Sequence, residues 1–264
     1  MIIDLTGRKA VVSGSTGGIG RAIAEGLART GASVTINGRG QARVEAALRE
    51  IRAAIPDAKI DGIAGDLGTA EGVAAFTGRA ADADILVNNL GTAVPRAFAD
   101  LKDEDWLNLF QINVMSGVRM TRHYLPAMVE RGWGRVVFIS SESAVNIPKE
   151  MIDYGMTKTA QLAISRGLAE QVAGSGVTVN AVLPGPTRSE GLGRYTKAAA
   201  DAQGVTQEAI EQQFLTHMRP TSLIKRFATT EEVANMVVYV CSDQASATTG
   251  AALRVDGGVV RFVA

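Results

Sequence analysis

Short apolar runs rich in β-branched residues alternate along the chain with longer stretches in which apolar positions recur at helical spacing. Seven segments have the first pattern: 9–13, 33–37, 59–64, 84–88, 135–140, 177–183 and 251–255. The clearest helical stretches are 19–29, 43–54, 104–130 and 155–173, and Gly31, Gly132 and Gly176 stand where helices would end. This alternation predicts an α/β fold in which a doubly wound, seven-stranded parallel sheet lies between two layers of helices.

One segment, 188–226, interrupts the alternation between the sixth and seventh predicted strands. It carries mixed charge and a helical stripe of apolar residues formed by Ile210, Phe214, Leu215 and Met218. Two interpretations stay open: a helical pair that packs on the domain, and a mobile lid over a substrate pocket. No linker or low-complexity tract divides the rest, so residues 1–264 are expected to form a single domain.

Charge and cysteine content exclude several classes of function. Lys plus Arg equals Asp plus Glu at 27 each, so no excess positive charge favours nucleic acid or an anionic membrane as a partner. A lone cysteine, Cys241, and two histidines argue against a disulfide or a zinc site, and Cys241 is expected to be a small buried apolar residue. Without a signal sequence or a long apolar run, the protein is expected to be cytoplasmic.

A glycine-rich stretch follows the first predicted strand and opens the first predicted helix. Such a turn brings backbone N–H groups against a pyrophosphate at a helix N-terminus, although a purely structural glycine turn is the alternative. The candidate nucleotide-binding residues here are Gly14, Ser15, Thr16, Gly18, Ile19 and Gly20.

The ends of the next two strands bear on the choice of cofactor. A carboxylate that would hold the adenosine ribose of NAD is missing after the second strand, where the sequence reads Asn37-Gly38-Arg39. Arg39 offers a planar cation suited to a 2′-phosphate, which favours NADP, unless it is a solvated loop residue. Asp66, followed by Leu67, is placed either to bind the adenine amino group or to cap the helix that starts near Thr69.

Three residues in the middle of the chain are candidates for proton chemistry. Tyr154 and Lys158 lie four residues apart and so share one face of a predicted helix. A phenol with a pKa of about 10 is a poor catalyst at neutral pH, but a neighbouring ammonium and a positively charged nicotinamide would lower that pKa. Ser141 stands at the end of the fifth strand, at the sheet edge where ligands bind in parallel α/β proteins.

Together these motifs resemble the short-chain dehydrogenase/reductase family, and the resemblance covers essentially the whole chain. The matching elements, in chain order, are Gly14, Gly18 and Gly20; Asn88-Asn89-Leu90-Gly91; Asn113; Ser141; Tyr154 with Lys158; and Pro184-Gly185 followed by Thr187. Three positions depart from the family pattern. Ser13 replaces the usual Thr, Leu90 replaces Ala beside the cofactor, and Gly17 stands where many NADP-preferring members carry Arg or Lys.

The resemblance implies a Rossmann-like fold, no metal, and a catalytic set of Asn113, Ser141, Tyr154 and Lys158. Tyr154 would act as general acid or base, Ser141 would orient the substrate oxygen, and Lys158 would hold the nicotinamide ribose and lower the Tyr154 pKa. Asn113, at a helix irregularity, would hold a water of the proton relay. The implied cofactor contacts add Asn89, Gly91, Pro184, Gly185 and Thr187 to the residues named above, with Tyr154 and Lys158 again among them. Family members commonly form tetramers, so a homotetramer or homodimer through 104–130 and 229–264 is expected.

The resulting prediction is an oxidoreductase of the 3-oxoacyl-reductase type that uses NADPH in preference to NADH. It would interconvert a ketone or 3-oxo compound and a secondary alcohol. An NAD-dependent alcohol or sugar dehydrogenase and a non-catalytic nucleotide-binding redox sensor are the alternatives.

The nature of the substrate stays open, because the loops 92–99, 142–153 and 188–226 have mixed chemistry. Their apolar residues suggest an apolar pocket, while four cations would suit an acidic or acyl-carrier-linked substrate: Arg96, Lys149, Arg188 and Arg194. Glu142 either enters the pocket or, as is more common at a strand end, is solvated. His123 and His217 match no motif.

Overall fold

A computed structural model describes residues 2–263, and its centre is a seven-stranded sheet in which all neighbouring pairs are parallel. The strand order is β3-β2-β1-β4-β5-β6-β7, so the order reverses between β1 and β4. The strands are β1 (Lys9–Val12), β2 (Ser33–Gly38), β3 (Ile60–Ala64), β4 (Ile85–Asn88), β5 (Gly134–Ile139), β6 (Val177–Pro184) and β7 (Ala252–Val255). The predicted doubly wound, Rossmann-like sheet is confirmed, and each predicted run contains one of these strands to within one or two residues.

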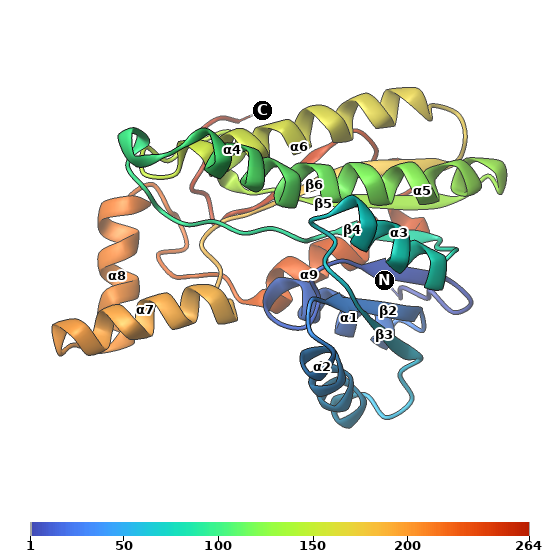
Figure 1. Cartoon of the computed structure of the whole chain (residues 1–264), viewed down its shortest axis with the longest axis horizontal. Coiled ribbons are helices and arrows are strands. Elements are labelled where there is room, and N and C mark those ends of the chain that lie inside the picture. Colours follow the sequence, from blue (N-terminus) through green and yellow to red (C-terminus); the bar gives the residue numbers. More distant parts are fainter. Residues whose placement is uncertain (1, 264) are drawn as a thin grey trace.

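Helices cover both faces of the sheet (Figure 1). They are α1 (Gly18–Arg29), α2 (Gln41–Ala54), α3 (Ala70–Arg79), α4 (Asp103–Phe110), α5 (Ser116–Glu130), α6 (Ile152–Gln171), α7 (Glu190–Gln203), α8 (Gln207–Met218) and α9 (Thr230–Val240). Side chains of α1, α2 and α9 share one apolar core with the sheet, and those of α3, α5 and α6 share a second core on the other face. Among the described residues, no helix is long and apolar enough to cross a membrane.

The long helix predicted over 104–130 is divided into α4 and α5 by a π-helical turn, Gln111–Met115. We attribute the turn to a contact from another helix, because the Gln161 amide of α6 donates to the Asn113 carbonyl over 2.6 Å. A side chain that takes a helix carbonyl in this way widens the helix at that point. The turn places Asn113 in a buried position beside the ends of β4 and β5.

The segment 188–226 contains the helical pair α7 and α8, which stands to one side of the sheet in Figure 1. Each helix begins with a side-chain cap: the hydroxyl of Ser189 accepts from Leu192 N, and that of Thr206 accepts from Ala209 N. Of the predicted apolar stripe, Ile210 and Leu215 are buried, and the Phe214 ring packs edge-on against Phe227. The contacts of α8 are with α7 and, through Phe214, with the segment that follows α8, so both interpretations of 188–226 stay open.

Candidate active site

The turn between β1 and α1 is tight at two glycines whose conformations an L side chain resists. Gly14 and Gly18 have φ values of 60° and 56°. Asn89, at the end of β4, closes the turn, because its side-chain amide donates to the carbonyls of Ser13 (3.0 Å) and Gly14 (2.9 Å). Ser15 is buried, with its hydroxyl donating to the Val12 carbonyl and its backbone N–H donating to the Asn37 carbonyl, so both donors of Ser15 are used within the protein.

Gly20 lies where α1 passes over this turn. A Cβ at Gly20 would stand 2.3 Å from the Asn89 amide nitrogen and 2.6 Å from the Gly14 carbonyl oxygen. We expect Gly20→Ala to lower the free energy of unfolding by about 1–3 kcal/mol and to weaken nucleotide binding, measured by denaturant unfolding and by nucleotide titration. The matched control is Gly78→Ala in α3, where a Cβ meets nothing within 4 Å. That change should stabilise by about 0.5–1 kcal/mol, and equal effects at both positions would contradict the close-approach argument.

The end of β2 carries an amide instead of an acid. Asn37 is buried, and its side chain donates to the carbonyls of Ile63 and Gly65 at 3.1 Å each. Arg39 follows on the surface, next to the glycine-rich turn: a Cβ at Gly38 would lie 2.5 Å from the Thr16 methyl carbon. As predicted, no carboxylate stands at the end of β2 to bind the ribose. The Asn37 amide that takes its place is hydrogen-bonded to the neighbouring strand end.

A second cation at this end of the site, Arg43, was missed by the sequence analysis. It lies in the first turn of α2, and its Nη2 is 3.6 Å from the position of a Cβ on Gly17. Its partner is Glu190 at the start of α7, at 3.2 Å. The available signal was its position one helical turn after Arg39.

Of the two roles predicted for Asp66, the structure contradicts one, the capping of α3. The Asp66 carboxylate accepts from Gly68 N over 2.9 Å, while Thr69 is the residue that caps α3. Capping by Asp66 is therefore wrong. The Leu67 side chain is fully buried in the core, which leaves only its backbone for a cofactor.

The four predicted catalytic residues come together at the carboxyl ends of β4 and β5. The Lys158 ammonium donates to the Ile139 carbonyl (2.8 Å) and lies 5.5 Å from the centre of the Tyr154 ring. The Asn113 side chain forms two hydrogen bonds with the backbone of Thr92, at 2.8 and 2.9 Å. A Cβ on Gly91 would lie 3.3 Å from Lys158 Nζ and 3.6 Å from Asn113 Oδ1, so the two polar groups flank this glycine.

Ser141 sits directly after β5 and begins a short 3₁₀ turn, Glu142–Ala144. Its hydroxyl oxygen accepts from Ser143 N at 3.1 Å, and its hydroxyl proton is donated to Glu142 Oε2 at 3.2 Å. The proximity of Ser141 lowers the pKa of Tyr154, against the larger opposing effect of burial. Serine and phenol are thus placed to hold one substrate oxygen between them.

Burial sets the protonation states of this cluster. It raises the pKa of Tyr154 to about 12 and lowers the pKa of Lys158 to about 7, because a buried charge loses its hydration. In the protein without cofactor, burial outweighs the interaction with Ser141, so the lower Tyr154 pKa expected beside a charged nicotinamide stays a prediction for the complex. At neutral pH, Tyr154 is a phenol that can donate a proton.

Residues of the last predicted cofactor motif lie where β6 ends. Gly185 is indispensable there, because a Cβ would stand 2.6 Å from the Asp256 carbonyl oxygen. Pro184 is the last residue of β6, and Thr187 is buried with its hydroxyl on the Gly185 carbonyl at 2.9 Å. Leu90, the residue that adds bulk next to the cofactor, is half-buried against the core shared by α3, α5 and α6.

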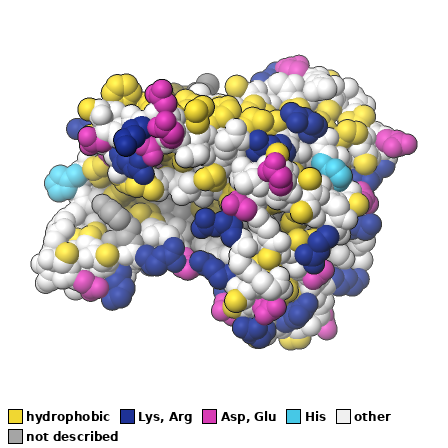
Figure 2. Space-filling view, viewed as in Figure 1, with side chains coloured by type: hydrophobic (Ala, Val, Ile, Leu, Met, Phe, Trp, Pro, Cys, Tyr) yellow, Lys and Arg dark blue, Asp and Glu magenta, His cyan; other side chains and the backbone are white. Residues whose placement is uncertain are grey.

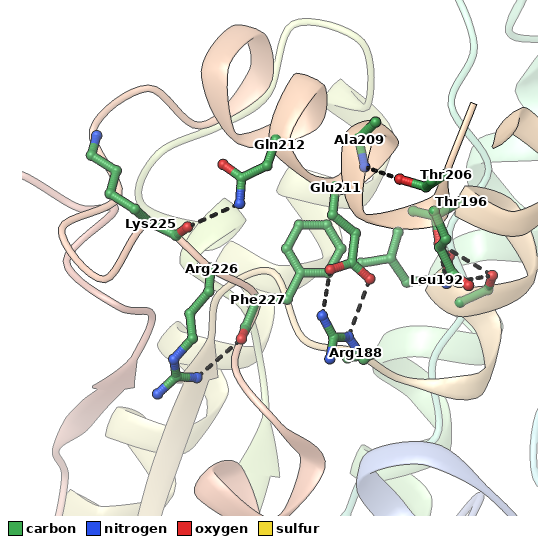
Figure 3. A network of polar contacts seen from close by, with 12 residues as sticks. Arg188, Leu192, Thr196, Thr206, Ala209, Glu211, Gln212, Lys225, Arg226 and Phe227 are labelled. Carbon is green, nitrogen blue, oxygen red and sulfur yellow. Dashed lines mark hydrogen bonds and ion pairs between the residues drawn. The ribbon is translucent and has the colours of Figure 1, made fainter. Parts of the chain in front are cut away.

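The surface between the α7–α8 pair and the rest of the molecule is hollowed, with Lys and Arg side chains along one edge (Figure 2). Three of the four cations predicted to bind an acidic substrate are engaged in ion pairs. Arg96 pairs with Asp105 (2.6 Å), Arg188 with Glu211 (2.6 Å, Figure 3) and Arg194 with Glu190 (2.5 Å). Lys149 is exposed.

Glu142 contradicts the expectation of a solvated strand-end carboxylate. Only 3% of the residue is exposed, and it forms an ion pair with Arg219, which is 5% exposed. The two residues are 77 positions apart, so nothing in the local pattern announces the pair. By contrast, Cys241 is fully buried as predicted.

Comparison with known proteins places the chain in a family. A family model described as enoyl-(acyl carrier protein) reductase matches residues 14–260. The chain belongs to the short-chain dehydrogenase/reductase family. It is therefore an oxidoreductase of the class that interconverts C=O and CH–OH groups with a nicotinamide cofactor.

Relatives within the family span several activities. The chain is 45% identical to an uncharacterized oxidoreductase of Bacillus subtilis, YvaG, over the whole of both chains. It is 34% identical to the 3-oxoacyl-[acyl-carrier-protein] reductase of Aquifex aeolicus, over 98% of this chain and all of that one. The structure of L-sorbose reductase from Gluconobacter frateurii, complexed with NADPH and L-sorbose, covers both chains completely with a TM-score of 0.92 and 32% identity.

Proposed function

We propose that this short-chain dehydrogenase/reductase reduces an uncharged ketone to a secondary alcohol with NADPH. The observation that carries the proposal is the geometry of the cluster, in which the Lys158 ammonium lies 5.5 Å from the centre of the Tyr154 ring and the Ser141 hydroxyl oxygen is held by Ser143 N. Reduction of a carbonyl needs a proton donor at the nascent alkoxide, and the Tyr154 phenol, whose pKa burial raises, carries that proton at neutral pH. We infer the direction from the similar structures that are complexes with NADPH.

Each of the four clustered residues has a task in this proposal. The Tyr154 hydroxyl donates its proton to the carbonyl oxygen, and the Ser141 hydroxyl polarises that oxygen from a second side. Lys158 holds the ribose next to the nicotinamide and stabilises the phenolate left on Tyr154, and Asn113 holds a water that returns a proton through Lys158. The cofactor, when bound, supplies the hydride to the carbonyl carbon.

The residues at the ribose end of the site fit NADPH. Asn37 stands where a carboxylate would repel a 2′-phosphate, and the exposed Arg39 lies near the glycine-rich turn, whereas Arg43 is already paired with Glu190. The L-sorbose reductase and actinorhodin ketoreductase structures, which are similar to this chain, are complexes with NADPH. The proposed cofactor contacts are Gly14, Ser15, Thr16, Gly18, Ile19, Gly20, Arg39, Asp66, Leu67, Asn89, Gly91, Tyr154, Lys158, Pro184, Gly185 and Thr187.

Replacement of Arg39 tests the cofactor choice. We expect Arg39→Ala to weaken NADPH binding about 10- to 100-fold, since a hydrogen bond to a charged group contributes about 1.5–3 kcal/mol, and to leave NADH binding within twofold. Titration of nicotinamide fluorescence measures both affinities. The control is Arg29→Ala at the end of α1, away from the carboxyl edge of the sheet, which should change neither. An equal loss for NADPH and NADH in Arg39→Ala would remove the assignment.

An uncharged substrate is favoured by the way the loop cations are used. Arg96, Arg188 and Arg194 each have a carboxylate partner within the chain, so they are poorly placed to bind a carboxylate or a phosphorylated carrier. L-Sorbose, the ketose in the similar reductase structure, is a neutral polyhydroxy ketone. We therefore place polyhydroxy ketones and other small neutral ketones ahead of 3-oxoacyl thioesters.

The proposal also covers the domain organisation, the location in the cell and the oligomeric state. The chain acts as a single domain in the cytoplasm, with 188–226 forming one wall of the substrate pocket. Exposed apolar side chains on the α4–α5 side, including Phe98 and Leu107, and Phe262 near the carboxyl end, support a homotetramer or homodimer.

An activity screen tests the proposed function. Wild-type protein with NADPH is offered polyhydroxy ketones, simple ketones and 3-oxoacyl thioesters, and loss of nicotinamide absorbance is followed. Consumption with a neutral ketone supports the proposal. Consumption confined to the thioesters would overturn the substrate class.

A further inference from the structure

A buried carboxylate sits one residue beyond Ser141 and has no part in the reaction as described so far. Glu142 Oε2 accepts hydrogen bonds from the hydroxyls of Ser141 (3.2 Å) and Ser143 (2.5 Å). Its other oxygen, Oε1, accepts from Arg219 Nε at 2.5 Å. The Glu142 side chain thus contacts the hydroxyls of Ser141 and Ser143 and the guanidinium of Arg219.

The cation comes from the α7–α8 segment. Arg219 follows the last residue of α8, and its Nη1 donates to the Met218 carbonyl over 2.8 Å. The same nitrogen lies 3.6 Å from the carboxylate of Glu150, in the loop before α6. Arg219 therefore connects the end of α8 with the two segments that carry Ser141 and Tyr154.

The energetics of this ion pair indicate a role other than stability. Taking two charges out of water is costly, and apolar replacements of a buried ion pair are often equally stable. The pair is therefore weak evidence for stability, and the hydrogen bond from Ser141 to Glu142 points instead to a role at the site. The Arg188–Glu211 pair of the same segment provides a contrast, since it is bidentate, its arginine side chain is 58% exposed, and it joins only parts of 188–226 (Figure 3).

We propose that Glu142 is a positioning residue for Ser141, anchored from the α7–α8 segment by Arg219. The assignment rests on the proposed function. Glu142 and Ser143 N together hold the Ser141 hydroxyl oxygen in place. The Glu142 carboxylate accepts a hydrogen bond from the Ser141 hydroxyl, and the Ser143 N–H donates one to the Ser141 oxygen. When a ketone binds, only the Ser141 proton has to rotate toward the ketone oxygen, while Oγ stays in place. The α7–α8 segment, through Arg219, thereby helps to assemble the residues that polarise the substrate.

Two double variants separate positioning from stability. Glu142→Leu with Arg219→Met removes both charges, and Arg166→Met with Glu170→Leu does the same to an exposed ion pair in the last turns of α6, outside the pocket. We expect both proteins to fold and to bind NADPH within twofold of wild type. The first should lose about 10- to 100-fold in kcat with the neutral ketone, because small errors in placement cost this much, and the second should stay within twofold.

Glu142→Gln keeps an acceptor oxygen near Ser141, and Glu142→Leu removes it, so these two single variants remain informative if the first double variant does not fold. We expect kcat of Glu142→Gln to stay within about threefold of wild type and kcat of Glu142→Leu to fall about 10- to 100-fold. The KM for the ketone and the affinity for NADPH should stay within twofold in both. A purely structural role would change the thermal stability of the two proteins and leave their kcat values alike.

The outcomes are distinguishable from those of the proposed function. If wild-type protein consumes no ketone, the proposed function fails, and this assignment fails with it. If wild type is active but the first double variant keeps full kcat, or Glu142→Gln and Glu142→Leu have the same kcat, the positioning role alone is overturned.

Discussion

Replacing Tyr154 by Phe is expected to lower kcat for ketone reduction by about 10²–10⁴-fold, the usual contribution of a positioned general acid. The change removes only the hydroxyl and keeps the ring, so the packing around α6 is preserved. NADPH affinity should stay within about threefold, because no cofactor phosphate contact depends on the phenol. Steady-state turnover and fluorescence titration give the two quantities.

The control for this change is Tyr239→Phe in α9, which removes a phenol hydroxyl on the helix layer shared with α1 and α2. It should leave kcat within twofold of wild type. Turnover near the wild-type rate in Tyr154→Phe, with NADPH still bound, would show that another group donates the proton.

Lys158→Met is expected to have the second-largest effect, about a 10²–10³-fold loss in kcat, because a buried cation that stabilises developing charge is removed. Burial lowers the pKa of Lys158 to about 7, so its cationic form is lost as pH rises through that value. Wild-type kcat/KM for NADPH should therefore fall with pH in this range. The same profile in Lys158→Met should lack that fall.

Comparing the two proteins isolates Lys158 from the 2′-phosphate of NADPH, which itself titrates at a pH of about 6. Thermal unfolding without cofactor is an independent measurement. Between pH 7 and the ordinary lysine pKa the unfolded chain binds more protons, so wild-type stability should rise with pH, and Lys158→Met should show a smaller rise. Parallel profiles in the two proteins would mean that Lys158 does not titrate in this range.

The sheet was predictable because a parallel strand covered on both faces is apolar throughout, and seven such runs with short helical stretches between them admit few arrangements. Helix boundaries were less accessible where distant side chains decide them. The π-helical turn at Asn113 depends on the Gln161 amide, 48 residues away, and no local pattern encodes that contact.

In the site, too, residues that belong to a sequence motif could be predicted, and residues placed by distant contacts could not. Ser141, Tyr154, Lys158 and Asn113 could be found because their spacing matches a known motif and the topology gathers the carboxyl ends of β4 and β5. Arg43 was missed because a cation at the start of a helix has no distinctive pattern. Arg219 was missed, and Glu142 was expected to be solvated or in the pocket, because the burial of a charge depends on what covers it and Arg219 comes 77 residues later.

The central claim, a Tyr154-dependent reduction of a neutral ketone with NADPH, is tested most directly by a single-turnover experiment. Wild-type protein loaded with one equivalent of NADPH is mixed with the ketone identified in the screen, and NADPH and the alcohol product are quantified. The account predicts one alcohol formed per NADPH consumed in the wild type and a rate at least 100-fold lower in Tyr154→Phe. Loss of NADPH without formation of alcohol, or equal rates in the two proteins, would contradict it.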